Sequence, residues 1–202
     1  MQEYASTCIN NREAEMSVIS EYIDGLGDCL KALPEKSIAD IADTIYRAYQ
    51  KNKQVIIMGN GGSASTASHF ARDLRIGTAV KGKPRVRAMS ITDNMAMITS
   101  LANDIDYNSI FKEQLVGQLD EGDVIIGVSA SGNSPNVLKA VKYARENGAI
   151  TIALTGFDGG KLKGLVDKVI IVASRDYGQV EDVHLSLDHI ISYSVKAMIA
   201  GD

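Results

Sequence analysis

The sequence has few of the residues that would place it among disulfide-rich or zinc-finger proteins. Only two cysteines, Cys8 and Cys29, occur in 202 residues, and neither has a neighbour at the spacing of a metal-binding motif. Two lone cysteines do not make a framework of disulfides. We therefore expect reduced thiols in a cytoplasmic protein.

The sequence also lacks an excess of positive charge and a long apolar run. Its formal net charge is −4, which argues against a general nucleic-acid-binding surface. A small anion remains a suitable ligand, because backbone N–H groups hold anions without net positive charge. No apolar run is long enough to span a bilayer, and residues 1–16 lack the basic start and apolar stretch of a signal peptide. The expected partners therefore include neither nucleic acid nor a membrane.

Two amphipathic helical patterns occupy the first part of the chain, over 13–33 and 37–50, with Pro34 between them. Each repeats apolar residues at three- and four-residue steps, which makes one apolar helix face. The first pattern packs either on its own domain or on a partner subunit. We assign residues 1–53 to oligomer packing and expect a homotetramer with these helices at its centre. The apolar residues of the first pattern are Met16, Ile19, Ile23, Leu26, Leu30 and Leu33.

Short apolar runs separated by helical stretches fill the remainder, residues 54–202. The runs are rich in β-branched residues and do not alternate strictly, which is typical of parallel strands covered on both faces. They lie at 54–58, 86–91, 123–129, 149–155 and 168–173. The helical stretches lie near 63–74, 94–102, 108–119, 134–147 and 181–199. This alternation predicts an α/β domain with a doubly wound, mostly parallel five-stranded sheet flanked by helices.

Two loops have the composition of anion-binding sites. The first, GNGGSAST at 59–66, follows a predicted strand and opens a helix, where glycines let the backbone approach an anion and the free N–H groups can bind it. The second, SASGNSPN at 129–136, has the same place after another strand and adds serine hydroxyls. Each loop alone is also compatible with a simple turn and helix cap. Two such loops at equivalent ends of parallel strands favour a phosphate ligand.

A dinucleotide site fits this pattern poorly. The segment GNGGSA matches the glycine spacing G-x-G-x-x-A after a strand, but the fingerprint also needs an acid about twenty residues later. The segment TAVKGKPR at 78–85 is basic there, and Asp93 comes too late. A nucleotide-dependent oxidoreductase is therefore the weaker hypothesis.

Five segments together resemble the sugar isomerase (SIS) domain family, most closely its phosphoheptose isomerases. These segments are GNGGSASTASHFARDL at 59–74, LANDIDYNSIF at 101–111, SASGNSPNV at 129–137, LTGFDGGKL at 154–162 and EDVHLSLDH at 181–189. The resemblance implies the SIS fold, active sites at subunit interfaces and an aldose–ketose isomerisation through an enediol(ate). The implied reaction interconverts sedoheptulose 7-phosphate and D-glycero-D-manno-heptose 7-phosphate.

The resemblance also implies which residues bind the substrate. The assigned positions are Asn60, Gly61, Gly62, Ser63, Asn103, Asp104, Ser129, Ala130, Ser131, Ser134 and Glu181. Among them, Ser63 and the segment from Ser129 to Ser134 would hold the phosphate. Ala130 stands where the family usually has a hydroxyl residue, so one donor to the phosphate is missing.

The same resemblance implies a zinc site, or a site for another divalent transition metal, at His69, Asp73, Glu181 and His189. The family usually has glutamate and glutamine where this chain has Asp73 and Glu181. His69 and Asp73 are four residues apart, so they share a helix face. Glu181 and His189 are eight apart, which separates them by about 80° around a helix, and they converge if Glu181 lies at a frayed helix start. His184 points elsewhere by the same arithmetic.

Each of these residues also has an ordinary structural explanation. His69 fits a hydrogen-bonded core position, and Asp73 fits an ion pair with Arg72 or Arg75. Glu181 fits a stabilising acid near a helix N-terminus, and His189 fits a surface position beside Asp188. Two imidazoles and two carboxylates nevertheless make a plausible set for a transition metal. The occurrence of all four at the family's positions favours the metal.

The implied chemistry needs a base that removes a proton next to the carbonyl and an acid that serves the oxygens. By the resemblance Asp73 is the base and His189 its partner acid or base. Aspartate is one methylene shorter than glutamate, so Glu181 is the alternative base, and the sequence leaves the choice open. The alternative function is a non-catalytic SIS-fold protein that binds phosphosugars in a regulatory or replication-associated role. Retention of both histidines favours the enzyme.

Overall fold

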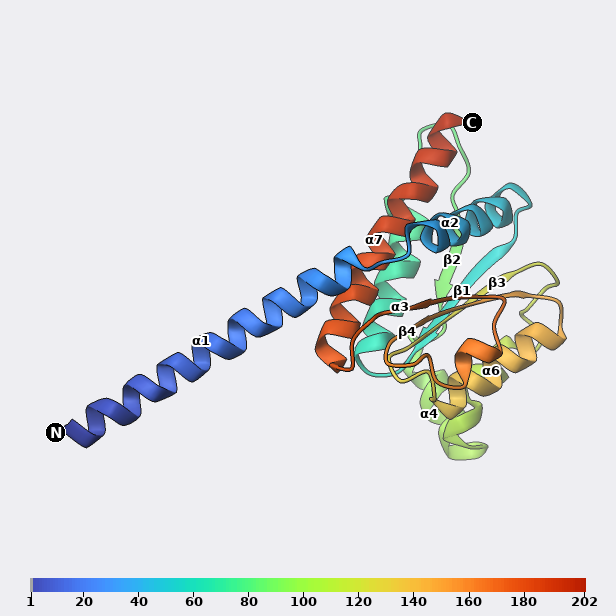
Figure 1. The fold of residues 1–202 in the computed structure, drawn as a ribbon. Helices are drawn as coiled ribbons and strands as arrows, with labels where there is room; N and C mark the ends of the chain where they lie inside the picture. The colour runs from blue at the N-terminus through green and yellow to red at the C-terminus, as the bar shows by residue number, and fades with distance from the viewer. Residues whose placement is uncertain (1) are drawn as a thin grey trace.

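A computed structural model describes the backbone of residues 2–202 and the side chains of residues 16–202. Its centre is a parallel five-stranded sheet in the order β2-β1-β3-β4-β5, with helices on both faces (Figure 1). The strands are β1 (Gln54–Gly59), β2 (Arg87–Ser90), β3 (Val124–Ser129), β4 (Ile150–Thr155) and β5 (Lys168–Ile171). The predicted doubly wound sheet is therefore confirmed, and all five strands lie within or close to the predicted runs.

Alternating side chains of the strands build two separate cores. Val55 and Ile57 of β1 join the core that faces α2 (Glu35–Gln50), α3 (Gly62–Arg72) and α7 (Tyr177–Gly201). Ile56 and Met58 join the opposite core, under α4 (Met95–Asp104), α5 (Ile110–Leu115) and α6 (Pro135–Glu146). Because both faces are buried, the strands can be apolar at successive positions, as their sequences are. Three short helices complete the described fold: a π-helical turn at Asp73–Gly77 and two 3₁₀ turns at Tyr107–Ser109 and Leu162–Gly164.

Helix α1 (Gln2–Lys31) divides into a part that packs on the chain's own core and a part that does not. Cys29 is buried, and Leu26 and Leu33 pack beside it. In contrast, Met16, Ile19 and Ile23 are 62%, 52% and 62% exposed, and α1 extends away from the body (Figure 1). The side chains described for residues 16–202 therefore leave the apolar face of this stretch uncovered. Within the part of the chain that the structure describes, no helix is long and apolar enough to cross a membrane.

The strand order puts the two candidate anion loops next to each other. β1 pairs with β3 in the middle of the sheet, and Gly59 is in register with Val128. From β1 the chain continues to β2 on one side of this pair, and from β3 it continues to β4 on the other side. The order of strands therefore reverses between β1 and β3. The crevice outside the carboxyl ends of the strands at such a reversal is the usual ligand site of open α/β sheets.

Candidate functional site

The first loop turns sharply between β1 and α3. Gly61 has φ +56°, a conformation in which an L side chain is strained, and α3 begins at the next residue. The second loop leads from Ser129 to α6, where Ser134 is the N-cap and Pro135 occupies the first turn. The hydroxyl oxygens of Ser129 and Ser134 are 3.1 Å apart. Hydroxyls and a helix N-terminus therefore converge at the second loop, which suits a phosphate.

A pair of amide side chains ties the two loops together. Asn60 Nδ2 donates to Asn136 Oδ1 over 2.9 Å, and Asn136 Nδ2 donates to Asn60 Oδ1 over the same distance. The Tyr107 hydroxyl also donates to Asn60 Oδ1 at 3.1 Å. Because the side chain of Asn60 is engaged in these bonds, it fixes the spacing of the loops, and its backbone remains for a ligand. Neither Asn136 nor Tyr107 was singled out from the sequence.

The other predicted substrate residues differ in how far they are buried. Ser63 is buried in the first turn of α3, and Ala130 is buried at the end of β3. Ser131 Oγ accepts from the backbone N–H of Asn133 at 3.3 Å. Asn103 and Asp104 are exposed at the end of α4, where the Asn103 amide donates to the Asp104 carboxylate at 2.8 Å. Tyr107, in the 3₁₀ turn that follows α4, donates its hydroxyl to Asn60 and so holds this part of the chain beside the first loop.

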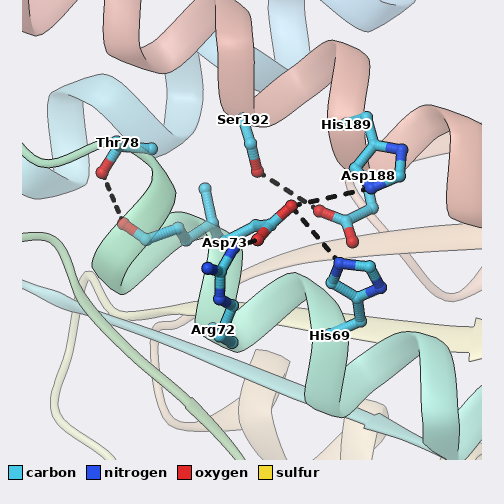
Figure 2. Close-up of polar contacts among 8 residues, drawn as sticks. His69, Arg72, Asp73, Thr78, Asp188, His189 and Ser192 are labelled. Carbon is cyan, nitrogen blue, oxygen red and sulfur yellow. Dashed lines mark hydrogen bonds and ion pairs between the residues drawn. The ribbon is translucent and has the colours of Figure 1, made fainter.

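Two histidines and two aspartates converge where α3 and α7 pack together (Figure 2). His69 Nε2 lies 3.6 Å from Asp73 Oδ2, and His189 Nε2 lies 3.7 Å from the same oxygen. The rings of the two histidines meet edge to face with centroids 5.1 Å apart. One ligand atom from each of His69, Asp73, Asp188 and His189 lies within 4.8 Å of the others. The helix therefore continues far enough past His69 to keep Asp73 on the same face, as the four-residue spacing predicted.

Asp73 stands at the junction of α3 and the π-helical turn, where it is 6% exposed. Arg72 forms an ion pair with its Oδ1, one of the two pairings that the sequence allowed. The other oxygen faces the two imidazoles. Arg72 thus holds the carboxylate in an orientation that presents Oδ2 to His69 and His189 (Figure 2).

Asp188 is the member of this group that the sequence did not single out. It is fully buried, Ser192 Oγ donates to its Oδ1 at 3.3 Å, and its Oδ2 has no hydrogen-bond partner among the described residues. Burial and, secondly, the negative charge of Asp73 raise the pKa of Asp188 to about 7. A signal was available in the sequence, because Asp188 falls on the apolar stripe of its helix beside Leu187 and Ile191, where a charged residue is exceptional.

Glu181 lies apart from this group, beside the first loop. A Cβ added to Gly62 would stand 2.3 Å from Glu181 Oε2, so the carboxylate covers the first residue of α3. Helix α7 begins at Tyr177 because Asp176 caps it, accepting from the N–H of Gln179 at 3.0 Å. Glu181 is consequently inside the second turn rather than at a frayed start. Its α-carbon is about 12 Å along the helix axis from that of His189.

The geometry of the histidine–aspartate group suits a divalent transition metal. Two ligands of a tetrahedral zinc ion are about 3.4 Å apart when each lies about 2.1 Å from the metal, close to the two Nε2–Oδ2 distances. An unpartnered carboxylate oxygen in the same group is a further indication, since a buried acceptor without a donor is costly. The side chains of His69 and His189 are 40% and 39% exposed, so a bound ion would be reachable from solution.

Comparisons with known proteins match most of the chain. The SIS domain matches residues 21–156. A phosphoheptose isomerase from Pelobacter propionicus is 36% identical over 164 residues, which are 81% of this chain and 86% of that protein. A phosphoheptose isomerase from Fusobacterium nucleatum is 37% identical over 188 residues, 91% of this chain and 96% of the relative. The solved structure of phosphoheptose isomerase GmhA from Neisseria gonorrhoeae superposes with a TM-score of 0.82 at 29% identity, covering 92% of this chain and 98% of that one.

Proposed function

Because the chain belongs to the SIS domain family, we propose that it catalyses the aldose–ketose isomerisation of a sugar phosphate. The relatives are named phosphoheptose isomerases, and we take the substrate to be the one that the resemblance implies, sedoheptulose 7-phosphate, converted to D-glycero-D-manno-heptose 7-phosphate through an enediol(ate). The convergence of His69, Asp73 and His189 carries the proposal, because it brings metal-type ligands together on α7 and on α3, the helix that the first anion loop opens.

The phosphate is assigned to the second loop. Ser129, Ser131 and Ser134 offer hydroxyls there, and the N-terminus of α6 adds backbone N–H groups and a partial positive charge. The N-terminus of α3 is less suitable for a dianion, because the Glu181 carboxylate already lies against Gly62. Asn60, Gly61, Gly62 and Ser63 then line the path of the sugar chain between the phosphate and the histidines, with Asn103 and Asp104 as further contacts to its hydroxyls.

Glu181 is the base that the geometry favours. Asp73 is nearly buried, and its two oxygens face Arg72 and the two imidazoles, so it is poorly placed to reach a carbon atom. Glu181 is only partly buried, one methylene longer and level with the loop that lines the substrate path. Its carboxylate would take the proton next to the carbonyl. The resemblance gives His189 as the partner acid or base, but its Nε2 faces the same Asp73 oxygen as His69 Nε2, so we assign it to the metal instead.

His69, Asp73 and His189 would hold zinc or another divalent transition metal, and Asp73 would bind through the oxygen that Arg72 leaves free. When bound, such an ion polarises the substrate carbonyl and stabilises the negative charge that develops on its oxygen. The remaining work falls to the protein's own groups. They anchor the phosphate, align the open chain and move one proton between neighbouring carbons.

A homotetramer is the assembly that α1 favours. Met16, Ile19 and Ile23 present an apolar face that a single chain leaves exposed, and burial of such a face against other copies is the common reason for closed symmetric assemblies. Active sites at the subunit interfaces would follow. Light scattering at micromolar concentration checks this, and a monomer there would contradict it.

Incubation of the pure protein with sedoheptulose 7-phosphate, with and without zinc, tests the activity itself. We expect conversion that zinc accelerates. If binding of the sugar phosphate is observed by calorimetry without any conversion, the protein is a non-catalytic phosphosugar-binding protein of the SIS family.

A further inference from the structure

The buried carboxylate of Asp188 is the feature of this site that the resemblance leaves unexplained. Water does not reach it, Ser192 satisfies only its Oδ1, and its Oδ2 has no donor. Asp73 repels the charge of Asp188, and Arg72 offsets only part of this repulsion, because its guanidinium is paired with Asp73 Oδ1. A buried carboxyl group of this kind is normally protonated, paired with a cation or bound to a metal ion.

We propose that Asp188 is a ligand of the divalent metal, completing a site with His69, Asp73 and His189 in the position that the resemblance assigns to Glu181. The inference rests on the proposed function only in taking the ion to be present. It concerns which side chains of this chain bind the ion, and the isomerase reaction need not occur for it to hold.

The distances favour Asp188 over Glu181. A ligand atom of Asp188 lies within 4.8 Å of those of His69, Asp73 and His189, and Glu181 does not belong to that group. Glu181 is about two helical turns away along α7, with its carboxylate against Gly62. A divalent ion coordinated by Asp188 Oδ2 would remove the unsatisfied acceptor and offset the repulsion between the two aspartates.

The exposure of the four side chains gives the site a closed and an open side. Asp188 and Asp73 are 0% and 6% exposed, whereas both imidazoles are partly open to solvent. An ion between them would be anchored from the buried side and approached by substrate oxygens from the imidazole side. Glu181, free of the metal, would then be available for the proton next to the carbonyl.

Cobalt(II) is a suitable probe, because its visible spectrum reports the number and type of ligands. The wild-type protein, Asp188→Asn, Glu181→Gln and a control variant, Asp182→Asn, are titrated with Co²⁺. Asp182 lies on the same helix, is exposed and bonds to the hydroxyl of Tyr22, so its variant controls for loss of one charge from α7.

We expect Asp188→Asn to weaken Co²⁺ binding by at least about tenfold, the lower end of what loss of even an outer-shell partner costs, and to change the visible spectrum. Glu181→Gln and Asp182→Asn should keep the wild-type spectrum and affinity. Unchanged Co²⁺ binding in Asp188→Asn would overturn the assignment, as would an equal loss in Glu181→Gln.

A second measurement avoids substitutions altogether. Anomalous diffraction from the zinc-loaded wild-type protein should place Asp188 Oδ2 at about 2.0–2.2 Å from the ion, and Glu181 at that distance in its stead would refute the inference. Thermal unfolding in EDTA checks that Asp188→Asn folds. Wild-type protein that binds Co²⁺ through Asp188 yet isomerises no sugar phosphate would refute the proposed function and leave this inference intact.

Discussion

Substitution of Gly62 by alanine should separate catalysis from folding. The new Cβ would meet Glu181 Oε2 at 2.3 Å and Cδ at 2.6 Å, whereas ordinary contacts begin near 3.4 Å. The carboxylate must therefore move by about 1 Å, and a displacement of this size at a catalytic group costs about 10²-fold in rate. Because Glu181 is flexible and partly exposed, the move strains no backbone, and alanine in a helical turn stabilises the fold by about 0.4–1 kcal/mol.

The assay is the exchange of solvent deuterium into the carbon next to the carbonyl of the sugar phosphate, followed by mass spectrometry. Gly62→Ala should lose about 10²-fold in exchange rate, melt no lower than the wild type and keep its calorimetric affinity for inorganic phosphate. Gly164→Ala is the matched control, since no atom lies within 4 Å of its added Cβ. Exchange in Gly62→Ala at the wild-type rate would refute Glu181 as the base.

Three further predictions concern the phosphate, the metal and a buried histidine. Ser131→Ala removes a hydrogen-bond donor to the charged phosphate, and such a bond is worth about 1.5–3 kcal/mol. Calorimetry should therefore show about a tenfold or greater loss of phosphate affinity, and unchanged affinity would mean that the phosphate binds elsewhere. Zinc at about a hundred times its Kd should raise the free energy of unfolding by about 2.7 kcal/mol, with reversal by EDTA, and no shift would argue against a bound metal. Burial lowers the pKa of His184 to about 4 from 6.5, so the unfolded chain takes up a proton first as the pH falls. The free energy of unfolding should drop by about 3 kcal/mol between about pH 6.5 and pH 4 from this group. Urea unfolding of His184→Leu should lack that part of the pH dependence, and an identical slope would contradict it.

The sheet was predictable because buried parallel strands leave a strong signal. Runs such as the one at 54–58 are apolar and β-branched at successive positions, which only a strand covered on both faces requires. The ends of helices were harder to predict. The helix expected over 108–119 stops at Leu115, shortly before Gly117 with φ +75°, and α7 starts four residues early because Asp176 caps it.

The early start of α7 explains why the candidate site was only partly predictable. His69, Asp73 and His189 converge because each spacing is set within a helix and the two helices pack together. The position of Glu181 depended on where α7 begins, which periodicity does not define to within a turn. Asp188 left one signal in the sequence, its place on the apolar stripe of α7 beside Leu187 and Ile191. Its contact with the metal-type group depends on how α3 packs against α7, which the sequence pattern does not give.

The most direct test of the central claim is deuterium exchange by the wild-type protein loaded with zinc. With sedoheptulose 7-phosphate we expect label at the carbon next to the carbonyl even where net conversion is slow, because a positioned base contributes about 10²- to 10⁴-fold to proton transfer. If protein loaded with zinc, manganese or nickel exchanges no label with any heptose, hexose or pentose phosphate, the protein is not an isomerase.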